Sequence, residues 1–366
     1  MGFWSGTVEV LVVDDGFWSG KRVLVTGHTG FKGGWLALWL ERLGARVCGL
    51  ALPPDSIPSL FEAARLDETI ESRLADIREA TAVAAVVADT APEIIFHLAA
   101  QPLVRRGYRA PLETLATNVM GTAHVLEAAR SCPSVRAIVV VTTDKCYENR
   151  AWPWGYREMD RLGGHDPYSA SKACAELVAA AWRASYWQSD DAPLVATARA
   201  GNVIGGGDWA EDRLVPDLIR AARAGRPALI RNPAAVRPWQ HVLEPLAGYL
   251  ALGARLLAGE RRFADAWNFG PSLEDMQAVS TLCNALCPTI GGHWQADGGE
   301  HPAEAAILRL DSSRAILELG WRPGWSLAQA LRATGQWYAR REAGEDARAL
   351  TLEQIGAYET AAGVPQ

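Results

Sequence analysis

Short apolar runs and longer amphipathic segments alternate along the chain from residue 21 onward. Runs with the length and apolar content of buried strands lie at 23–25, 46–52, 93–99, 135–143 and 196–199. Segments with apolar residues at helical spacing lie at 35–43, 80–90 and 112–131. Strands that alternate with helices form parallel sheets, because each parallel connection needs a crossover on one face. The pattern predicts an α/β fold built on a doubly wound parallel sheet of the Rossmann type.

Three glycines, Gly27, Gly30 and Gly33, separate the first predicted strand from the first predicted helix. A strand that enters a helix through such a turn points free backbone N–H groups and the positive end of the helix at one place, which suits a pyrophosphate. The spacing G-x-x-G-x-x-G differs from the common dinucleotide pattern G-x-G-x-x-G, and glycine triplets also occur in turns that bind nothing. The position between a strand and a helix favours nucleotide binding.

Small or polar residues follow the other predicted strands at the same edge of the sheet. They lie at Asp76, at 97–101 and at 142–147. Ligands of doubly wound sheets bind at this edge, so these loops and the glycine turn are expected to line one pocket. The tip of the second strand carries no acid for a ribose, and Asp55 beyond it is more typical of a solvated loop. No Lys or Arg occurs from 49 to 64, which favours NAD over a cofactor with a 2′-phosphate.

The composition narrows the possible partners. With 366 residues, 49% of them hydrophobic and 21% charged, the chain is expected to be globular with a sizeable core. A formal net charge of −6 argues against a general binder of nucleic acids or anionic membranes, so a small-molecule partner is expected. The six cysteines form no CxxC pair, which indicates reduced thiols and no metal site. No apolar run approaches about 20 residues and no basic-then-apolar leader opens the sequence, so a cytoplasmic protein without a membrane span is expected.

Tyr168 and Lys172 lie four residues apart on a helix that is predicted to start after Asp166. A cation beside a phenol lowers the pKa of the phenol, and a phenolate can take the proton from a sugar hydroxyl while hydride leaves the same carbon. The same spacing is common by chance on exposed helices, where the two side chains are simply solvated. Downstream of a glycine turn and polar strand-end loops, the catalytic interpretation is favoured.

Several longer segments carry a resemblance to one protein family. They are 26–33 (TGHTGFKG), 143–147 (TDKCY), 168–172 (YSASK), 199–209 (RAGNVIGGGDW) and 237–245 (RPWQHVLEP). Together they resemble the extended short-chain dehydrogenases/reductases that act on nucleotide sugars, and most closely the CDP-glucose 4,6-dehydratases among them. The resemblance covers roughly residues 17–337. It implies an NAD cofactor, a nucleotide-sugar substrate, a homodimer and a role in deoxysugar synthesis, such as that of lipopolysaccharide O-antigens.

The resemblance implies a reaction in three parts. The enzyme oxidises C4 of the sugar, removes water across C5 and C6, and returns the stored hydride to C6. Tyr168, Lys172 and Thr143 would serve the oxidation, whereas Asp144 and Lys145 would be the acid and the base of the elimination. An acid must keep its proton and a base must be neutral, so both side chains are expected in a dry pocket. The alternative is an ion pair between adjacent surface side chains.

The resemblance also implies binding residues. Cofactor contacts are expected at Gly27, Thr29, Gly30, Phe31, Lys32, Gly33, Asp76, Ile77, Leu98, Ala99, Ala100, Gln101, Asn118, Tyr168 and Lys172. Asn118 is given a supporting role, since a polar group inside a helix can also satisfy backbone groups. Candidate substrate contacts are Asn202, Arg213 and Arg237, because a guanidinium meets phosphate oxygens through two parallel hydrogen bonds. Arg213 could instead be ordinary helix surface.

The chain is expected to divide into unequal parts. Residues 1–16 are interpreted as an N-terminal extension that contains one copy of a repeated GFWSG segment, and residues 17–203 as an NAD-binding Rossmann domain. Residues 204–343 are expected to form a smaller, mainly substrate-binding region, with some segments that return to the Rossmann domain. Residues 344–366 are interpreted as a loosely held tail.

Other functions stay open at this point. A dehydratase for dTDP-glucose or GDP-mannose, or a nucleotide-sugar epimerase, would share much of this pattern. A non-catalytic NAD-binding regulatory protein would keep the fold and lose the chemistry. The presence of Tyr168, Lys172 and the segment 143–145 favours an enzyme, a hydro-lyase, over a regulator.

Overall fold

A computed structural model describes residues 16–299 and 308–362 of the chain. The expected N-terminal extension, except for its last residue, lies outside the described residues. The second copy of the GFWSG segment is described, and its Trp18 is fully buried. None of the helices in these two ranges has the length and apolarity of a membrane span.

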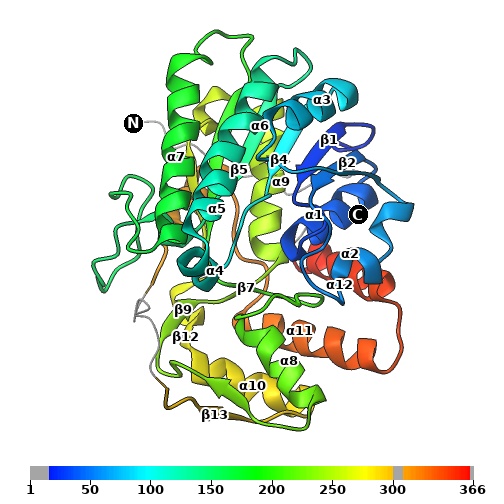
Figure 1. Cartoon of the computed structure of the whole chain (residues 1–366), viewed down its shortest axis with the longest axis vertical. Helices are drawn as coiled ribbons and strands as arrows, with labels where there is room; N and C mark the ends of the chain where they lie inside the picture. Colours follow the sequence, from blue (N-terminus) through cyan, green and yellow to red (C-terminus); the bar gives the residue numbers. More distant parts are fainter. Residues whose placement is uncertain (1–15, 300–307, 363–366) are drawn as a thin grey trace, which may run out of the picture.

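A seven-stranded parallel sheet forms the centre of the molecule (Figure 1). Its strands are β1 (Arg22–Thr26), β2 (Arg46–Ala51), β3 (Glu71–Leu74), β4 (Ile94–His97), β5 (Ala137–Val141), β6 (Leu194–Ala200) and β11 (Ala266–Phe269). They lie in the order β11-β6-β5-β4-β1-β2-β3, and every pairing is parallel. The chain reverses its direction of winding between β1 and β4, which is where doubly wound sheets bind ligands. The predicted doubly wound sheet is confirmed.

Helices cover both faces of this sheet. One face carries α3 (Ala80–Thr90), α6 (Gly121–Arg130) and α7 (Pro167–Ser185), and the other carries α1 (Phe31–Arg42), α9 (Leu243–Leu257) and α12 (Ala347–Ala361). Alternate residues of β1 serve the two faces, because Val23 and Val25 pack with the second group of helices and Leu24 packs with the first. The expected helix at 112–131 is present in three parts, namely α5 (Pro111–Leu115), a π-helical turn (Ala116–Met120) and α6.

A smaller region lies beyond one end of the sheet, in the lower part of Figure 1. It contains α8 (Leu214–Arg223), α10 (Val279–Ile290), α11 (Leu327–Glu342) and the strand pairs β8 (Ala228–Ile230) with β13 (Trp294–Ala296) and β9 (Val236–Pro238) with β12 (Met276–Ala278). The pair β7 (Val203–Ile204) with β10 (Gln240–His241) contacts α11. The chain returns to the large sheet through α9 and β11.

Short helical elements complete the described chain. They are α2 (Leu60–Ala63), α4 (Val104–Arg109), the one-turn helices Leu66–Glu68, Asp144–Cys146, Arg261–Phe263 and Leu273–Asp275, and the π-helical turn Ala315–Leu319.

The C-terminal residues do not form a loose tail. The expectation for 344–366 is wrong over α12, because this helix buries Ile355 and Tyr358 completely in the core. Its Glu359 accepts a hydrogen bond from the indole N–H of Trp39 (2.9 Å) and forms an ion pair with Arg42 (3.0 Å), both on α1. Helix α12 therefore covers α1.

A buried carboxylate joins α12 to α9. Glu244, near the start of α9, accepts hydrogen bonds from the hydroxyl of Tyr358 (2.7 Å) and from the backbone N–H groups of Gly324 (2.8 Å) and Trp325 (2.7 Å). Burial raises the pKa of Glu244 to about 7. Three segments that are far apart in the sequence therefore meet at one side chain.

Candidate active site

The glycine turn brings three backbone segments into contact. Gly27 has φ +81°, in the left-handed region that favours glycine, and a Cβ there would lie 2.8 Å from the backbone nitrogen of Ala99. A Cβ on Gly33 would lie 2.1 Å from the carbonyl oxygen of Gly27, which is closer than atoms can approach. The start of α1 is thereby packed against the ends of β1 and β4. Gly30, the residue before α1, is exposed, so the positive end of the helix is open to an anion.

Asn118 connects the loop after β4 to α7. Its side chain accepts the N–H of Gln101 (2.8 Å) and donates to the carbonyl of Gln101 (3.0 Å) and to the hydroxyl of Ser171 (2.8 Å). Leu98, Ala99 and Ala100 lie half-buried in the same loop. These contacts suit the supporting role that is expected for Asn118.

Other predicted cofactor residues surround the turn. The Thr29 hydroxyl donates to the backbone carbonyl that follows β2 (2.8 Å). Ile77 packs so closely on α6 that a Cβ on Gly121 would lie 2.5 Å from it. Asp76 accepts hydrogen bonds from Arg78, and these bonds lower the pKa of its carboxyl. Asp76 and Ile77 therefore lie at the carboxyl end of β3, as predicted.

The tip of β2 is filled by a histidine from the glycine turn. A Cβ on Gly49 would lie 2.2 Å from the His28 ring, which is fully buried and hydrogen-bonded to the hydroxyl of Ser72 (2.7 Å). Asp55, beyond this strand, is exposed and pairs with Arg106 of α4 (2.9 Å). No local sequence pattern indicates the contact with Arg106. The ribose contact stays unassigned.

Tyr168 and Lys172 are carried into the interior by α7. Asp166 caps this helix by accepting the N–H of Ser169 (3.0 Å), so α7 begins where the sequence predicts. Tyr168 is 8% and Lys172 is 7% exposed, which excludes the solvated pair of an exposed helix. The ammonium group of Lys172 donates to the carbonyl of Val141 at the end of β5 (3.1 Å).

Burial controls the charge of both side chains. It raises the pKa of Tyr168 to about 12, against the effect of the Thr143 side chain, and lowers the pKa of Lys172 to about 8, against the effect of Glu176. The expectation that Lys172 lowers the pKa of Tyr168 is therefore wrong in its net direction, because the loss of water around the phenolate is the larger effect.

The segment 143–145 forms a tight turn after β5. The Thr143 hydroxyl donates to one oxygen of Asp144 (2.9 Å) and accepts the N–H of Lys145 (3.3 Å). Asp144 is 2% exposed, and burial raises its pKa although nearby cations, Lys145 first among them, oppose the shift. The other Asp144 oxygen has no hydrogen-bond partner among the described residues. Asp144 is thus a buried acid and not half of a surface ion pair.

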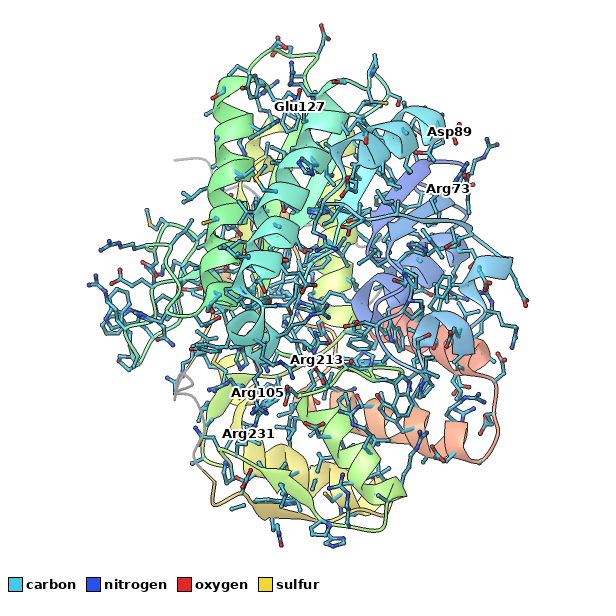
Figure 2. All side chains as sticks on the ribbon, viewed as in Figure 1. Arg73, Asp89, Arg105, Glu127, Arg213 and Arg231 are labelled. Carbon is cyan, nitrogen blue, oxygen red and sulfur yellow. The ribbon has the colours of Figure 1, made fainter. Side chains whose placement is uncertain are left out.

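Arginines from the smaller region reach the same place. Arg213 lies just before α8 and its charge acts on Tyr168, so it is not ordinary helix surface. Figure 2 shows Arg213 where the smaller region meets the region of the sheet. Arg237 on β9 is 7% exposed and its charge acts on Asp144. Asn202 lies half-buried just after β6.

Lys32 has a position that sequence reasoning missed. It was expected only as part of the cofactor turn, but burial and the charges of Arg213 and Lys172 lower its pKa to about 7. Its ammonium group lies 3.4 Å from the hydroxyl of Tyr249 on α9. Tyr249 sits inside an apolar helix, so no local pattern marks it.

The parallel sheet, its glycine turn and the buried pair Tyr168 and Lys172 define a nucleotide-binding enzyme of the dehydrogenase type. Residues 23–263 match the model of the NAD dependent epimerase/dehydratase family, and the chain belongs to that family. NAD is therefore its cofactor.

Two relatives and one solved structure show which members of the family the chain is similar to. The chain is 48% identical over 356 residues to the CDP-glucose 4,6-dehydratase of Salmonella typhimurium (strain LT2), which covers 96% of this chain and 99% of that protein. It is 26% identical to the dTDP-glucose 4,6-dehydratase of Xanthomonas campestris pv. campestris, over 91% of this chain and 98% of that one. A crystal structure of a DesIV double mutant, a dTDP-glucose 4,6-dehydratase from Streptomyces venezuelae with NAD and DAU bound, has a TM-score of 0.74 at 24% identity. That match covers 89% of this chain and 99% of the other, and it shows the same fold.

The described residues fit this cofactor. The exposed backbone at Gly30 gives a pyrophosphate access to the N-terminus of α1. Asp76 and Ile77 follow β3 at the same sheet edge, and Tyr168 and Lys172 are buried beside the end of β5. These residues would hold NAD across the point where the winding of the sheet reverses.

The close packing at Gly33 predicts a specific effect on cofactor binding. The change Gly33→Ala is expected to push α1 away from Gly27 and to raise the dissociation constant for NAD on the order of tenfold or more. Isothermal titration with NAD measures the effect. Gly34→Ala is the matched control, since a Cβ there would meet only the end of the Leu60 side chain at 3.2 Å. Equal NAD affinity in the two variants would contradict this account of the turn.

Proposed function

We propose that this protein catalyses the 4,6-dehydration of CDP-glucose to CDP-4-keto-6-deoxyglucose. The observation that carries the proposal is the 48% identity, over 96% of the chain, to a protein of that activity. The buried acid Asp144 beside Tyr168 supports a dehydration, because a leaving hydroxyl needs a proton. An epimerisation at C4 would not need that proton.

Tyr168 is the proposed base for the oxidation at C4. When bound, NAD accepts a hydride from the substrate and later returns it. Tyr168 takes the proton of the C4 hydroxyl, and Thr143 hydrogen-bonds the same oxygen. Burial raises the pKa of Tyr168 to about 12 even though the charge of Arg213 opposes the shift, so ionisation of the phenol needs further positive charge close by. Lys172 lies one helical turn away on α7.

Asp144 and Lys145 are the proposed acid and base of the elimination. The ketone at C4 acidifies the proton on C5, and the Lys145 side chain removes it. Asp144 gives its proton to the C6 hydroxyl, which leaves as water. The hydride then returns to C6 and a proton returns to C5, so the product differs from the substrate by one water. Burial suits Asp144 to this role, because it raises the pKa of the carboxyl and keeps the proton in place.

The sugar nucleotide is proposed to lie between the large sheet and the smaller region. Arg237 and Arg213 act there on Asp144 and Tyr168, and a guanidinium can bind diphosphate oxygens through two hydrogen bonds. Asn202 follows β6 at the same edge and is the third proposed contact.

We also propose that the protein forms a homodimer and that it is cytoplasmic. Apolar side chains are exposed on α5, the π-helical turn and α7, at Leu112, Met120 and Leu177, and these elements contact one another. Exposed apolar side chains on neighbouring elements support a homodimer. The free cysteines, most of them buried, support a cytoplasmic location.

The substrate is tested by incubating the purified protein with NAD and with CDP-glucose, dTDP-glucose or GDP-mannose in turn. We expect the 4-keto-6-deoxy product from CDP-glucose only, detected by mass spectrometry. Turnover of dTDP-glucose without turnover of CDP-glucose would overturn the choice of substrate.

Two substitutions separate the oxidation from the elimination. Tyr168→Phe removes the proposed base and is expected to slow C4 oxidation by about 10²- to 10⁴-fold. Asp144→Asn keeps the base but removes the acid, so reduced cofactor is expected to accumulate while product formation falls by a similar factor. Rapid-mixing absorbance of the reduced nicotinamide distinguishes the two. An Asp144→Asn enzyme with unimpaired dehydration would refute the role of Asp144.

The homodimer is tested by light scattering after size exclusion. Leu177→Asp puts a charge on the proposed contact surface and is expected to shift the protein to a monomer. Leu317→Asp, in another exposed apolar position at 80% exposure, is the control and is expected to stay dimeric. A monomeric unaltered protein would exclude the proposed assembly.

A further inference from the structure

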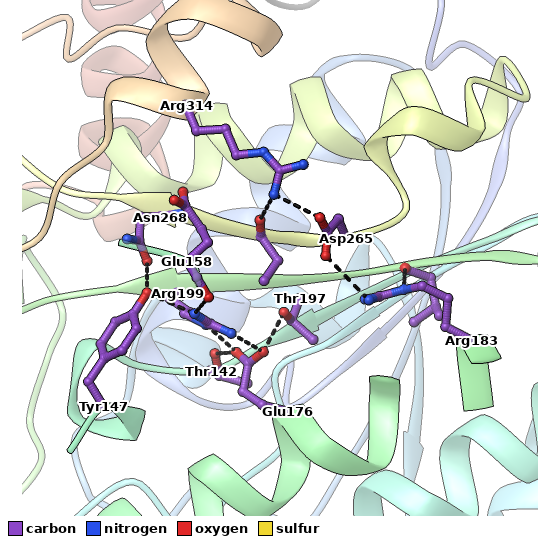
Figure 3. A network of polar contacts seen from close by, with 12 residues as sticks. Thr142, Tyr147, Glu158, Glu176, Arg183, Thr197, Arg199, Asp265, Asn268 and Arg314 are labelled. Atoms are coloured by element: carbon purple, nitrogen blue, oxygen red, sulfur yellow. Dashed lines mark hydrogen bonds and ion pairs between the residues drawn. The ribbon is translucent and has the colours of Figure 1, made fainter. Parts of the chain in front are cut away.

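A buried polar network joins α7, β6 and the residues on either side of the turn 143–145 (Figure 3). Its centre is the ion pair of Glu176 on α7 with Arg199 on β6, each 3% exposed. The guanidinium donates to both carboxylate oxygens, at 2.9 and 2.8 Å. Each oxygen also accepts one hydroxyl, from Thr142 on one side and from Thr197 on the other (2.6 Å). The carboxylate is thus bound on both oxygens.

This ion pair contacts the turn 143–145 at both of its ends. Thr142, which immediately precedes the turn, donates its hydroxyl to Glu176. Tyr147, two residues after the turn, accepts a hydrogen bond from Arg199 through its hydroxyl (2.8 Å). The ring of Tyr147 also lies 4.9 Å from the Arg199 guanidinium. Two separate anchors therefore hold one short turn.

The same ion pair belongs to the helix that carries the oxidation residues. Glu176 lies one helical turn beyond Lys172 on α7, and its charge opposes the lowering of the Lys172 pKa by burial. Burial would raise the pKa of Glu176, but the charge of Arg199 and the hydrogen bonds hold it below its usual value. The carboxylate therefore stays ionised inside the protein.

Stability alone does not account for this arrangement. The cost of removing two charges from water offsets much of their attraction, so a buried ion pair is weak evidence for stability. A better-supported use of such a pair is to specify how two surfaces meet. The surfaces here are the turn after β5 and the helix α7.

We propose that Glu176 and Arg199 are positioning residues that hold the turn 143–145 in register with Tyr168 and Lys172. The inference rests on the proposed function, in which both sets of residues act on adjacent carbons of one sugar. Tyr168 on α7 and Thr143 on the turn both act at C4, whereas Asp144 and Lys145 on the turn act at C6 and C5. A displacement of about 1 Å between reacting groups can cost on the order of 10²-fold in rate.

The two threonines of the network offer a matched test. Thr142→Val and Thr197→Val each remove one buried hydroxyl from the same carboxylate and keep the shape of the side chain. Thr142 immediately precedes the turn 143–145, whereas Thr197 lies within β6. Thr142→Ser restores the hydroxyl and serves as the rescue variant. The melting temperature, kcat and KM are measured for all three in the presence of NAD, and the melting temperature also without it.

If the network positions the turn, the two valine variants are expected to have similar melting temperatures but different kcat values. Both valine variants are expected to lower the melting temperature by similar amounts. Thr142→Val is expected to lower kcat on the order of 10- to 100-fold with KM nearly unchanged, because the turn loses its register after the sugar has bound. Thr197→Val and Thr142→Ser are expected to keep kcat within about threefold of the unaltered protein.

Three outcomes would overturn the inference. Equal losses of kcat in Thr142→Val and Thr197→Val, in step with their melting temperatures, would show a merely structural network. An unchanged kcat in Thr142→Val would show that the turn needs no such anchor, and a Thr142→Val chain that does not fold while Thr197→Val does would assign Thr142 to folding instead. The kcat values of the variants are measured with whichever nucleotide sugar the unaltered protein converts. If CDP-glucose is not converted, that result overturns the proposed function but leaves the test of the positioning residues intact.

Discussion

The removal of ionisable side chains from water is the constraint on which the site depends. Burial lowers the pKa of Lys32 to about 7 and of Lys172 to about 8, and it raises the pKa of Asp144 and of Tyr168. Each shift favours the neutral form. It brings the two lysines close to neutral pH and lets Asp144 hold its proton to a higher pH than an exposed carboxyl does. The fold offsets the cost with polar partners, such as the strand-end carbonyl that binds Lys172. Glu176 is the exception, because Arg199 keeps it charged.

The order of the strands arranges the chemistry along one edge. β5 lies between β4 and β6 in the sheet. The loop after β4 holds predicted cofactor residues, the turn after β5 holds the proposed acid and base, and the segment after β6 holds the proposed substrate contact Asn202. Cofactor, reacting carbons and substrate nucleotide therefore have neighbouring places at the edge, as the topology of a doubly wound sheet allows.

Local sequence patterns made part of the fold and part of the candidate site predictable. Strands β1, β2, β4, β5 and β6, α7 with its cap at Asp166 and the glycine turn are each encoded within a few residues, so their periods and turn residues identify them. β3 and β11 were not predicted. Contacts between distant segments have no such signal. The approach of Lys32 to Tyr249 depends on how α9 crosses the sheet, and α12 has a polar and alanine-rich sequence whose burial depends on α1. The net direction of the Tyr168 pKa also depends on burial in the complete fold.

The covering of α1 by α12 has a consequence for how the protein is made. The ribosome synthesises Trp39 some 320 residues before its partner Glu359, yet the two form one buried contact. Chains usually fold from the N-terminus during synthesis, one domain at a time. Here β11 adds the last strand of the described sheet and α12 covers α1, so the nascent cofactor-binding half carries an open apolar face until α12 has been made. A chain released early would present that face to chaperones and proteases.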